Sequence, residues 1–108
     1  TGITVAGQAD GTYGDGSNQL HYPNSVFLDF NEDMYIVDQN NHRIQKWLKN
    51  AVSGTTVAGN GSDPNINNRL FYPRDVYVNN QIIYISDTID DRIQCFMNGN
   101  LSSGRVLA

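Results

Sequence analysis

Two pairs of oppositely charged residues recur at the same spacing in this sequence. Asp38 and Arg43 stand five positions apart, and Asp87 and Arg92 repeat that spacing farther along the chain. Such a pair can bind a charged ligand, or it can close a turn, because the carboxylate accepts turn N–H groups and pairs with the guanidinium. A ligand site rarely needs one identical copy per repeat. We therefore predict that both pairs are structural turn clasps.

Residues suited to metal or covalent chemistry are scarce. The two histidines, His21 and His42, and the single cysteine, Cys95, form no local motif, whereas a catalytic zinc usually takes three protein ligands. The glycine-rich, acidic run at residues 10–18 lacks the ligand spacing and the terminal Glu of an EF-hand loop. No motif sets a nucleophile beside a general base. We predict no catalytic residue, no metal site and no cofactor, and hence no enzyme.

The elements that hold these residues come from an internal repeat. Four short motifs each occur twice, and the two copies are about 50 residues apart. A period of that length indicates a propeller blade or a solenoid unit. The motif pairs are GITVAG and GTTVAG (residues 2–7 and 54–59), LHYP and LFYP (20–23 and 70–73), YIVD and YISD (35–38 and 84–87), and RIQKW and RIQCF (43–47 and 92–96).

Each repeat has the pattern of four short strands. Apolar or alternating runs are separated by Gly, Asn and Asp turns, and no segment keeps a helical period. Four antiparallel strands per repeat are typical of a β-propeller blade. We predict an all-β partial propeller with blade 1 at residues 23–59 and blade 2 at residues 73–108. Residues 1–7 are expected to be one extra outer strand of a preceding blade. The chain alone would then close no ring, and we expect a fragment of a longer protein rather than a homotrimer.

The order of the motifs resembles that of NHL repeats. Pro23, Tyr35, Asp38 and the run NHRI at residues 41–44 match the most typical positions of that family. The second repeat departs from the pattern with DDRI at residues 90–93. The resemblance covers essentially the whole chain. It implies a radial β-propeller, commonly of six blades, in which further blades of the same parent chain flank these two.

Composition and charge narrow the classes of partner. The 108 residues carry a net charge of −4 and no cluster of Lys or Arg, whereas binding to a nucleic-acid backbone depends on a basic face. We therefore expect no nucleic-acid partner. No apolar run approaches the roughly 20 residues of a membrane-spanning helix. A single cysteine allows no internal disulfide, so the compartment stays undetermined.

The recurring aromatic residues are expected to serve mainly the core. Tyr35, Tyr84, Trp47 and Phe96 stand at matching places in the two repeats and should pack between neighbouring blades. Tyr22 and Tyr72 each precede a proline. These two tyrosines should fix how the chain enters a strand, or they should contact a partner.

The loops are the expected binding surface. Because the strands of a blade alternate in direction, the loop before the first strand and the turn between the second and third strands share one face. The loops of this face differ between the repeats in length and charge, so they can encode specificity that the fold does not dictate. The candidate contact residues are Tyr13, Asp15, His21, Asn40, Arg69 and Arg74.

These predictions favour a non-catalytic module for protein recognition or scaffolding. The resemblance leaves two further classes open: the adaptor portion of a RING-type ubiquitin ligase, and part of a metal-dependent peptidyl-hydroxyglycine amidating lyase. A RING needs many Cys and His ligands, which this chain does not have, and the shortage of histidine also argues against the lyase. RNA binding, as in some tripartite-motif propellers, would need a basic face.

Overall fold

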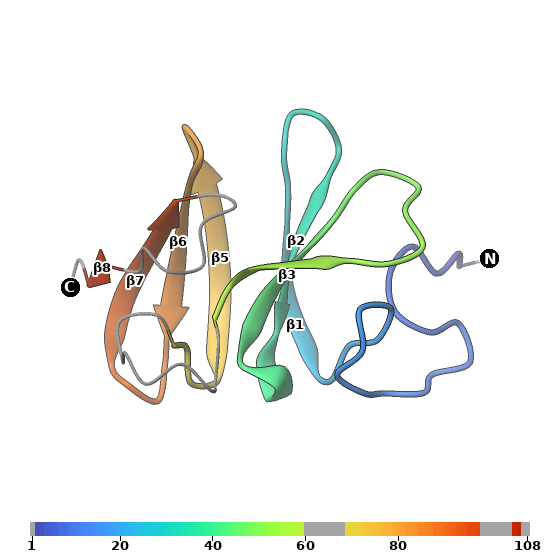
Figure 1. Ribbon diagram of the computed structural model, residues 1–108, viewed down its shortest axis with the longest axis horizontal. Helices are drawn as coiled ribbons and strands as arrows, with labels where there is room; N and C mark the ends of the chain where they lie inside the picture. The colour runs from blue at the N-terminus through green and yellow to red at the C-terminus, as the bar shows by residue number, and fades with distance from the viewer. Residues whose placement is uncertain (1, 60–68, 98–104, 107–108) are drawn as a thin grey trace.

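The computed structural model describes residues 2–59 and 69–97 and the backbone of residues 105–106, and its strands form two antiparallel sheets (Figure 1). In each sheet, strands that are neighbours in the sequence are also neighbours in space, which is the meander of a propeller blade. A short 3-10 helix, η1 (Gln39–Asn41), joins the second strand to the third. The first sheet consists of β1 (Pro23–Leu28), β2 (Met34–Asp38), β3 (Arg43–Trp47) and β4 (Thr55–Ala58), and the second of β5 (Pro73–Asn79), β6 (Ile82–Asp87), β7 (Arg92–Met97) and β8 (Arg105–Val106).

The predicted fold class is confirmed: the described chain is all-β, with two four-stranded blades and no closed ring. The structure differs from the prediction at the extra strand, because residues 2–7 belong to no sheet. A single strand needs a partner for its backbone N–H and C=O groups, and the described residues contain no third sheet. Residues 98–104 and 107–108 of the predicted blade 2 lie outside the described residues. Within the described part of the chain, no helix is long and apolar enough to cross a membrane.

The two blades begin in the same way. Each first strand starts at a proline, which pairs with the aspartate at the end of the second strand and is followed by a register shift. The tyrosines before the prolines, Tyr22 and Tyr72, have positive φ angles of 57° and 52°. The chain therefore turns sharply before each blade, instead of approaching it in the extended conformation that is usual before proline.

One hydrophobic core joins the two sheets, and β5 packs against both β1 and β2. Side chains alternate between the two faces of a strand. Tyr35 and Val37 therefore point toward the second sheet, whereas Ile36 points away from it. The buried members of the core are Tyr35, Val37, Ile44, Val57 and Ala58 from the first blade, and Leu70, Val76, Ile83, Ile85 and Phe96 from the second blade and the loop before it.

The recurring aromatic residues do not all lie between the sheets. Tyr35 and Phe96 are buried in the shared core, as predicted. Trp47 is buried too, but the strand register places it on the face opposite Tyr35, away from the second sheet. There its indole Nε1 donates to the carbonyl of Ala51 at 2.9 Å, within the β3–β4 connection. Tyr84 is half-buried.

Candidate binding groove and its turn clasps

The carboxylate of Asp38 lies at the end of β2 and is completely buried. One oxygen, Oδ1, accepts the backbone N–H of His21 at 2.6 Å. The other, Oδ2, accepts Nδ2 of Asn41 at 2.9 Å and Nε of Arg43 at 2.7 Å. Both oxygens of this carboxylate are therefore engaged by the protein itself, and the ion pair spans the turn between β2 and β3.

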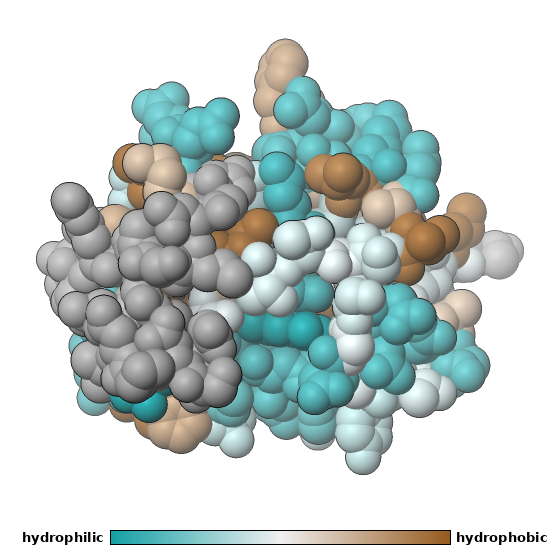
Figure 2. All heavy atoms as spheres, in the orientation of Figure 1, coloured by the Kyte–Doolittle hydropathy of each residue, from teal (hydrophilic) through white to brown (hydrophobic). Residues whose placement is uncertain are grey.

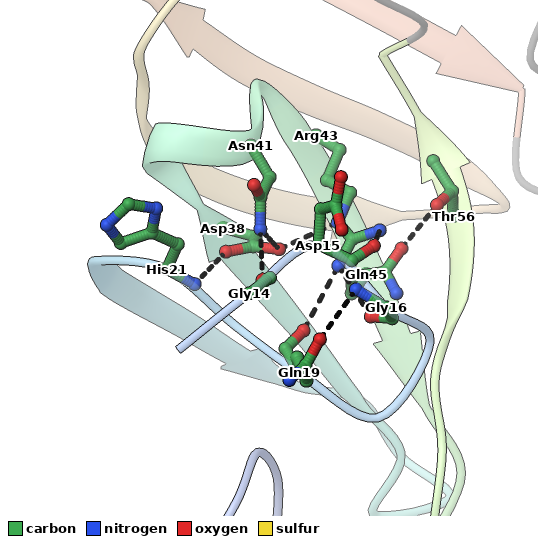
Figure 3. A network of polar contacts seen from close by, with 10 residues as sticks. All are labelled: Gly14, Asp15, Gly16, Gln19, His21, Asp38, Asn41, Arg43, Gln45 and Thr56. Carbon is green, nitrogen blue, oxygen red and sulfur yellow. Dashed lines mark hydrogen bonds and ion pairs between the residues drawn. The ribbon is translucent and has the colours of Figure 1, made fainter. Parts of the chain in front are cut away.

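The guanidinium of Arg43 extends the network into the glycine-rich loop before β1 (Figure 3). Nη1 donates to the carbonyl of Asp15, and Nη2 donates to the carbonyls of Gly16 and Gln19, each at 3.0 Å. Arginine suits this task because its planar donors can reach several acceptors at once. The ion pair thus fixes the shape of the loop that carries Tyr13 and Asp15.

The second blade repeats the arrangement with the same atoms. Oδ1 of the buried Asp87 accepts the backbone N–H of Phe71 at 2.5 Å, and Oδ2 accepts Nε of Arg92 at 2.6 Å. Nη2 of Arg92 donates to the carbonyl of Arg69 at 3.0 Å. Phe71 and Arg69 are the repeat equivalents of His21 and Gln19. In both blades the pair therefore ties the preceding loop to the turn between the second and third strands.

An open groove of about 620 Å³ lies beside the first clasp, between the N-terminal segment and the start of β1. The rings of Tyr13 and His21 stack here, with centroids 4.3 Å apart and an interplanar angle of 20°. The ring of Tyr22 lies 5.7 Å from that of His21. The lining residues are Ala6, Gly7, Gln8, Gly11, Thr12, Tyr13, Leu20, His21, Tyr22 and Pro23.

The loop that forms one wall of the groove is held by its own hydrogen bonds. Oδ1 of Asp10 accepts the N–H of Thr12 at 3.0 Å. Hydrogen bonds from the backbone and side chain of Thr12 lower the pKa of the Asp10 carboxyl.

Two further hydrogen bonds hold the rest of this loop. Nε2 of Gln8 donates to the carbonyl of Asn18 at 2.8 Å. Nδ2 of Asn41 donates to the carbonyl of Gly14 at 2.8 Å, which links the loop to the clasp. Tyr13 is therefore positioned by backbone contacts on either side of it.

Four of the six candidate contact residues lie in or beside the groove, and the other two lie on the second blade. Tyr13 and His21 line the groove together. The side chain of Asp15 is exposed nearby, while its carbonyl binds Arg43. The N–H of Asn40 donates to the carbonyl of His21 at 3.0 Å, so its backbone supports the groove.

Arg69 and Arg74 belong to the second blade and do not line the groove. Arg69 is half-buried, and its Nε is buried with no hydrogen-bond partner among the described residues. Arg74 follows Pro73 in β5 and is exposed. The six residues therefore do not form one site: two line the groove, two flank it, and two lie on the other blade.

The contact between the blades at His42 was not predicted from the sequence. Nδ1 of His42 accepts the backbone N–H of Tyr72 at 3.0 Å, and the two rings meet edge to face at 4.4 Å. Burial lowers the pKa of His42, against an opposing influence of the Asp87 carboxylate. The motif alone indicates a turn residue. The contact of His42 with Tyr72 in the next repeat is seen only when the two blades are packed together.

Among residues 2–59 and 69–97, no group of three or more His, Cys, Asp or Glu side chains is arranged to hold a metal ion. The free Cys95 is half-buried in β7.

Comparison with known proteins assigns no family, since no protein-family model matches the sequence and no curated protein is significantly similar to it.

Proposed function

We propose that this chain is part of an NHL-type β-propeller whose loop face recognises a protein partner and catalyses no reaction. The observation that carries the proposal is the groove beside the first clasp, in which aromatic rings are exposed and already positioned. Tyr13 and Tyr22 are each 68% exposed, although Tyr13 is stacked on His21. Surface this apolar, held in place without a partner, is typical of a recognition site.

The lining of the groove favours a peptide segment over other ligands. It contains no Asp, Glu, Lys or Arg, so neither a phosphate backbone nor a strongly charged metabolite would find a counter-charge there. Tyrosine gives a large amphipathic contact area at little cost in side-chain entropy, which is why it is common at protein interfaces. Gln8 and Thr12 add polar groups that can bind the backbone of a peptide.

The clasps support the same proposal because they make the groove rigid. Asp38 and Arg43 anchor the part of the loop that follows Tyr13, through the N–H of His21 and the carbonyls of Asp15 and Gln19. A loop that is ordered before binding loses less conformational entropy when the partner arrives. The buried charges therefore act on recognition through the shape of the loop, with no direct contact to the partner.

The test is selection of peptides from a displayed random library with the 108-residue chain as the target, followed by fluorescence titration of a selected peptide. Tyr13→Ala should weaken binding of that peptide by about tenfold or more, because the ring is a central contact. The matched control is Phe30→Ala, since Phe30 is fully exposed at the β1–β2 turn, away from the groove. Equal affinity of wild type and Tyr13→Ala would refute the proposed site.

A further inference from the structure

A second group of exposed aromatic rings lies at the seam between the two blades. The ring of His42 lies 4.4 Å from that of Tyr72, and the ring of Phe71 lies 5.2 Å from each of them, measured between centroids. Phe71 and Tyr72 remain 43% and 37% exposed. We call these three residues the seam cluster. Because a complete blade lies on either side of it, further blades of a parent chain would not cover it.

Backbone hydrogen bonds hold the seam cluster in place. The N–H of Phe71 donates to Oδ1 of Asp87 at 2.5 Å. The N–H of Tyr72 donates to Nδ1 of His42 at 3.0 Å. The carbonyl of Phe71 accepts the N–H of Ile89 at 3.3 Å, which brings this exposed residue of the β6–β7 turn beside the cluster. A partner that contacts these rings therefore orders little of this chain on binding, which keeps the entropic cost low.

The fold itself does not require these side chains. In the other repeat, Asp91 stands at the place of His42, and His21 stands at the place of Phe71. Asp91 and His42 both adopt positive φ angles, 52° and 54°, and the N–H of His21 still donates to its clasp aspartate. The backbone is thus the same with a carboxylate in place of the imidazole and an imidazole in place of the phenyl ring. Positions that vary on a repeated scaffold are free to encode binding.

The seam cluster and the groove lie on the same edge of the molecule, and η1 separates them. The N–H of Gln39 donates to the carbonyl of Tyr22 at 3.3 Å, and the N–H of Asn40 to the carbonyl of His21 at 3.0 Å. The start of η1 therefore lies against the groove, while His42, which follows its last residue, belongs to the seam cluster. A 3-10 helix of three residues rises by about 6 Å, which about two residues of extended peptide can span.

Both figures show this edge of the molecule. In Figure 1 the loops before β1 and β5 and the turns that follow β2 and β6 gather along the lower edge. In the same orientation, Figure 2 shows hydrophobic side chains exposed beside hydrophilic ones at the lower edge, below the second blade. The loop edge therefore offers a surface of mixed polarity that continues from one blade to the next.

The loop that carries Tyr13 adds negative charge beside the groove. The side chains of Asp10 and Asp15 are exposed there, and the guanidinium of Arg43 is engaged by Asp38. A partner with a basic side chain at this end of the surface therefore meets a counter-charge, whereas an acidic one is repelled.

We propose that one peptide segment of a partner protein lies across η1 and binds both blades. One apolar side chain contacts the stacked rings of Tyr13 and His21, a second contacts the seam cluster, and a basic side chain lies near Asp15. The proposal rests on peptide recognition at the groove and extends it from one anchor to two. The second contact forms on a segment that is already bound, so it adds affinity without a further loss of translational freedom.

The test is a set of double-mutant cycles with a peptide selected from a displayed random library on the 108-residue chain. Each peptide residue is replaced by alanine in turn, and affinity for wild type, Tyr13→Ala and Phe71→Ala is measured by fluorescence titration. Phe71→Ala should weaken binding of the unaltered peptide by about fivefold or more. Two different peptide residues should show coupling, one to Tyr13 and the other to Phe71, because residues in contact are not additive.

A second variant probes the seam without touching the core. Ile89→Ala, in the exposed turn beside the cluster, should also weaken binding, whereas Phe30→Ala, in the β1–β2 turn at the opposite edge, should bind like wild type. Asp15→Asn should weaken a peptide that carries a basic residue. Its matched control is Glu32→Gln, which removes the same charge from the β1–β2 turn and should have no effect on binding.

The outcomes separate the two proposals. If Phe71→Ala and Ile89→Ala bind the peptide as tightly as wild type while Tyr13→Ala weakens it, the second anchor is overturned and recognition at the groove stands. If Tyr13→Ala has no effect either, both proposals are overturned. The second anchor is also overturned if a single peptide residue couples to both Tyr13 and Phe71, since one contact would then account for both losses.

Discussion

At the scale of single residues, the two buried aspartates determine how the loops are held. A buried carboxylate is stable only when its charge and its acceptor positions are matched by the protein. Asp38 achieves this with a guanidinium, an amide and a backbone N–H. Asp87 achieves it with the guanidinium of Arg92 and the N–H of Phe71. These contacts account for the constant spacing of Asp and Arg in the two repeats.

Loss of one clasp carboxylate should therefore destabilise the chain strongly. Asp38→Ala leaves the Arg43 guanidinium and the His21 N–H without their acceptor, and it should lower the free energy of unfolding by about 3–5 kcal/mol. Urea unfolding followed by tryptophan fluorescence measures this change. Asp10→Ala, in an exposed turn, is the matched control and should have little effect. If Asp38→Ala lowered the free energy of unfolding as little as the control does, Asp38 would not stabilise the turn as a clasp.

His42 should make the stability of the chain depend on pH. Its pKa is lowered by burial, and Nδ1 can accept the N–H of Tyr72 only while it carries no proton. In the unfolded chain a histidine binds a proton near pH 6.5. The unfolded state therefore takes up more protons below that pH, so the contribution of His42 is full above about pH 6.5 and is lost as the pH falls toward the lowered value.

The measurement is the free energy of unfolding at pH 7 and at pH 5. We expect His42→Gln to reduce the difference between the two values, while the control His21→Gln retains more of it. An equal pH dependence in both variants would show that the Tyr72 contact is not coupled to protonation.

The residues of the site could be predicted only in part. The clasp pairs follow from their spacing and their recurrence, because a turn brings residues five apart into contact. The place of Tyr13 and His21 in a variable loop predicts that they contact a partner, and the structure stacks their two rings on each other. The contact between His42 and Tyr72 could not be predicted, since it joins two turns that are 30 residues apart and depends on how two rigid sheets pack.

At the scale of elements, the strands were predictable and the extra strand was not. Alternation and turn residues indicate where each strand of a blade lies, because these signals are local. The motif at residues 2–7 has nearly the same sequence as residues 54–59, which contain β4. Only the second copy has a neighbouring strand, β3, to bind. The same residues therefore form a strand in one context and irregular backbone in the other.

Gly7 and Gly59 end the two copies of this motif, and their replacement tests whether the two copies have different surroundings. Gly59 has a φ of +90°, and a Cβ added there would lie 2.4 Å from the backbone oxygen of His42, whereas Gly7, with a φ of +81°, would meet only the side chain of Leu20 at 3.4 Å. Gly59→Ala should lower the free energy of unfolding by more than about 2 kcal/mol, and Gly7→Ala by about 1 kcal/mol. Urea unfolding of both variants provides the comparison, and equal losses would contradict it.

At the scale of the whole molecule, the chain consists of two similar blades stacked in the same sense. This stacking buries one face of each blade against the other sheet, so that Val76 is 6% exposed whereas Val26, at the matching place in the first blade, is 59% exposed. The sequence indicates the repeat but not which faces meet, because the consecutive apolar residues 34–37 of β2 and 82–85 of β6 make both faces of these strands apolar. The relative exposure of Val26 and Val76 required the packed structure.

Nuclear magnetic resonance can show, residue by residue, whether the groove beside the first clasp recognises a peptide segment. A peptide selected on the chain would be titrated into ¹⁵N-labelled protein, and the backbone amide shifts would be followed. The largest changes should fall on the residues that line the groove, with Thr12, Tyr13, His21 and Tyr22 foremost. Changes confined to the second blade, or to the β1–β2 turn around Phe30, would contradict peptide recognition at the groove.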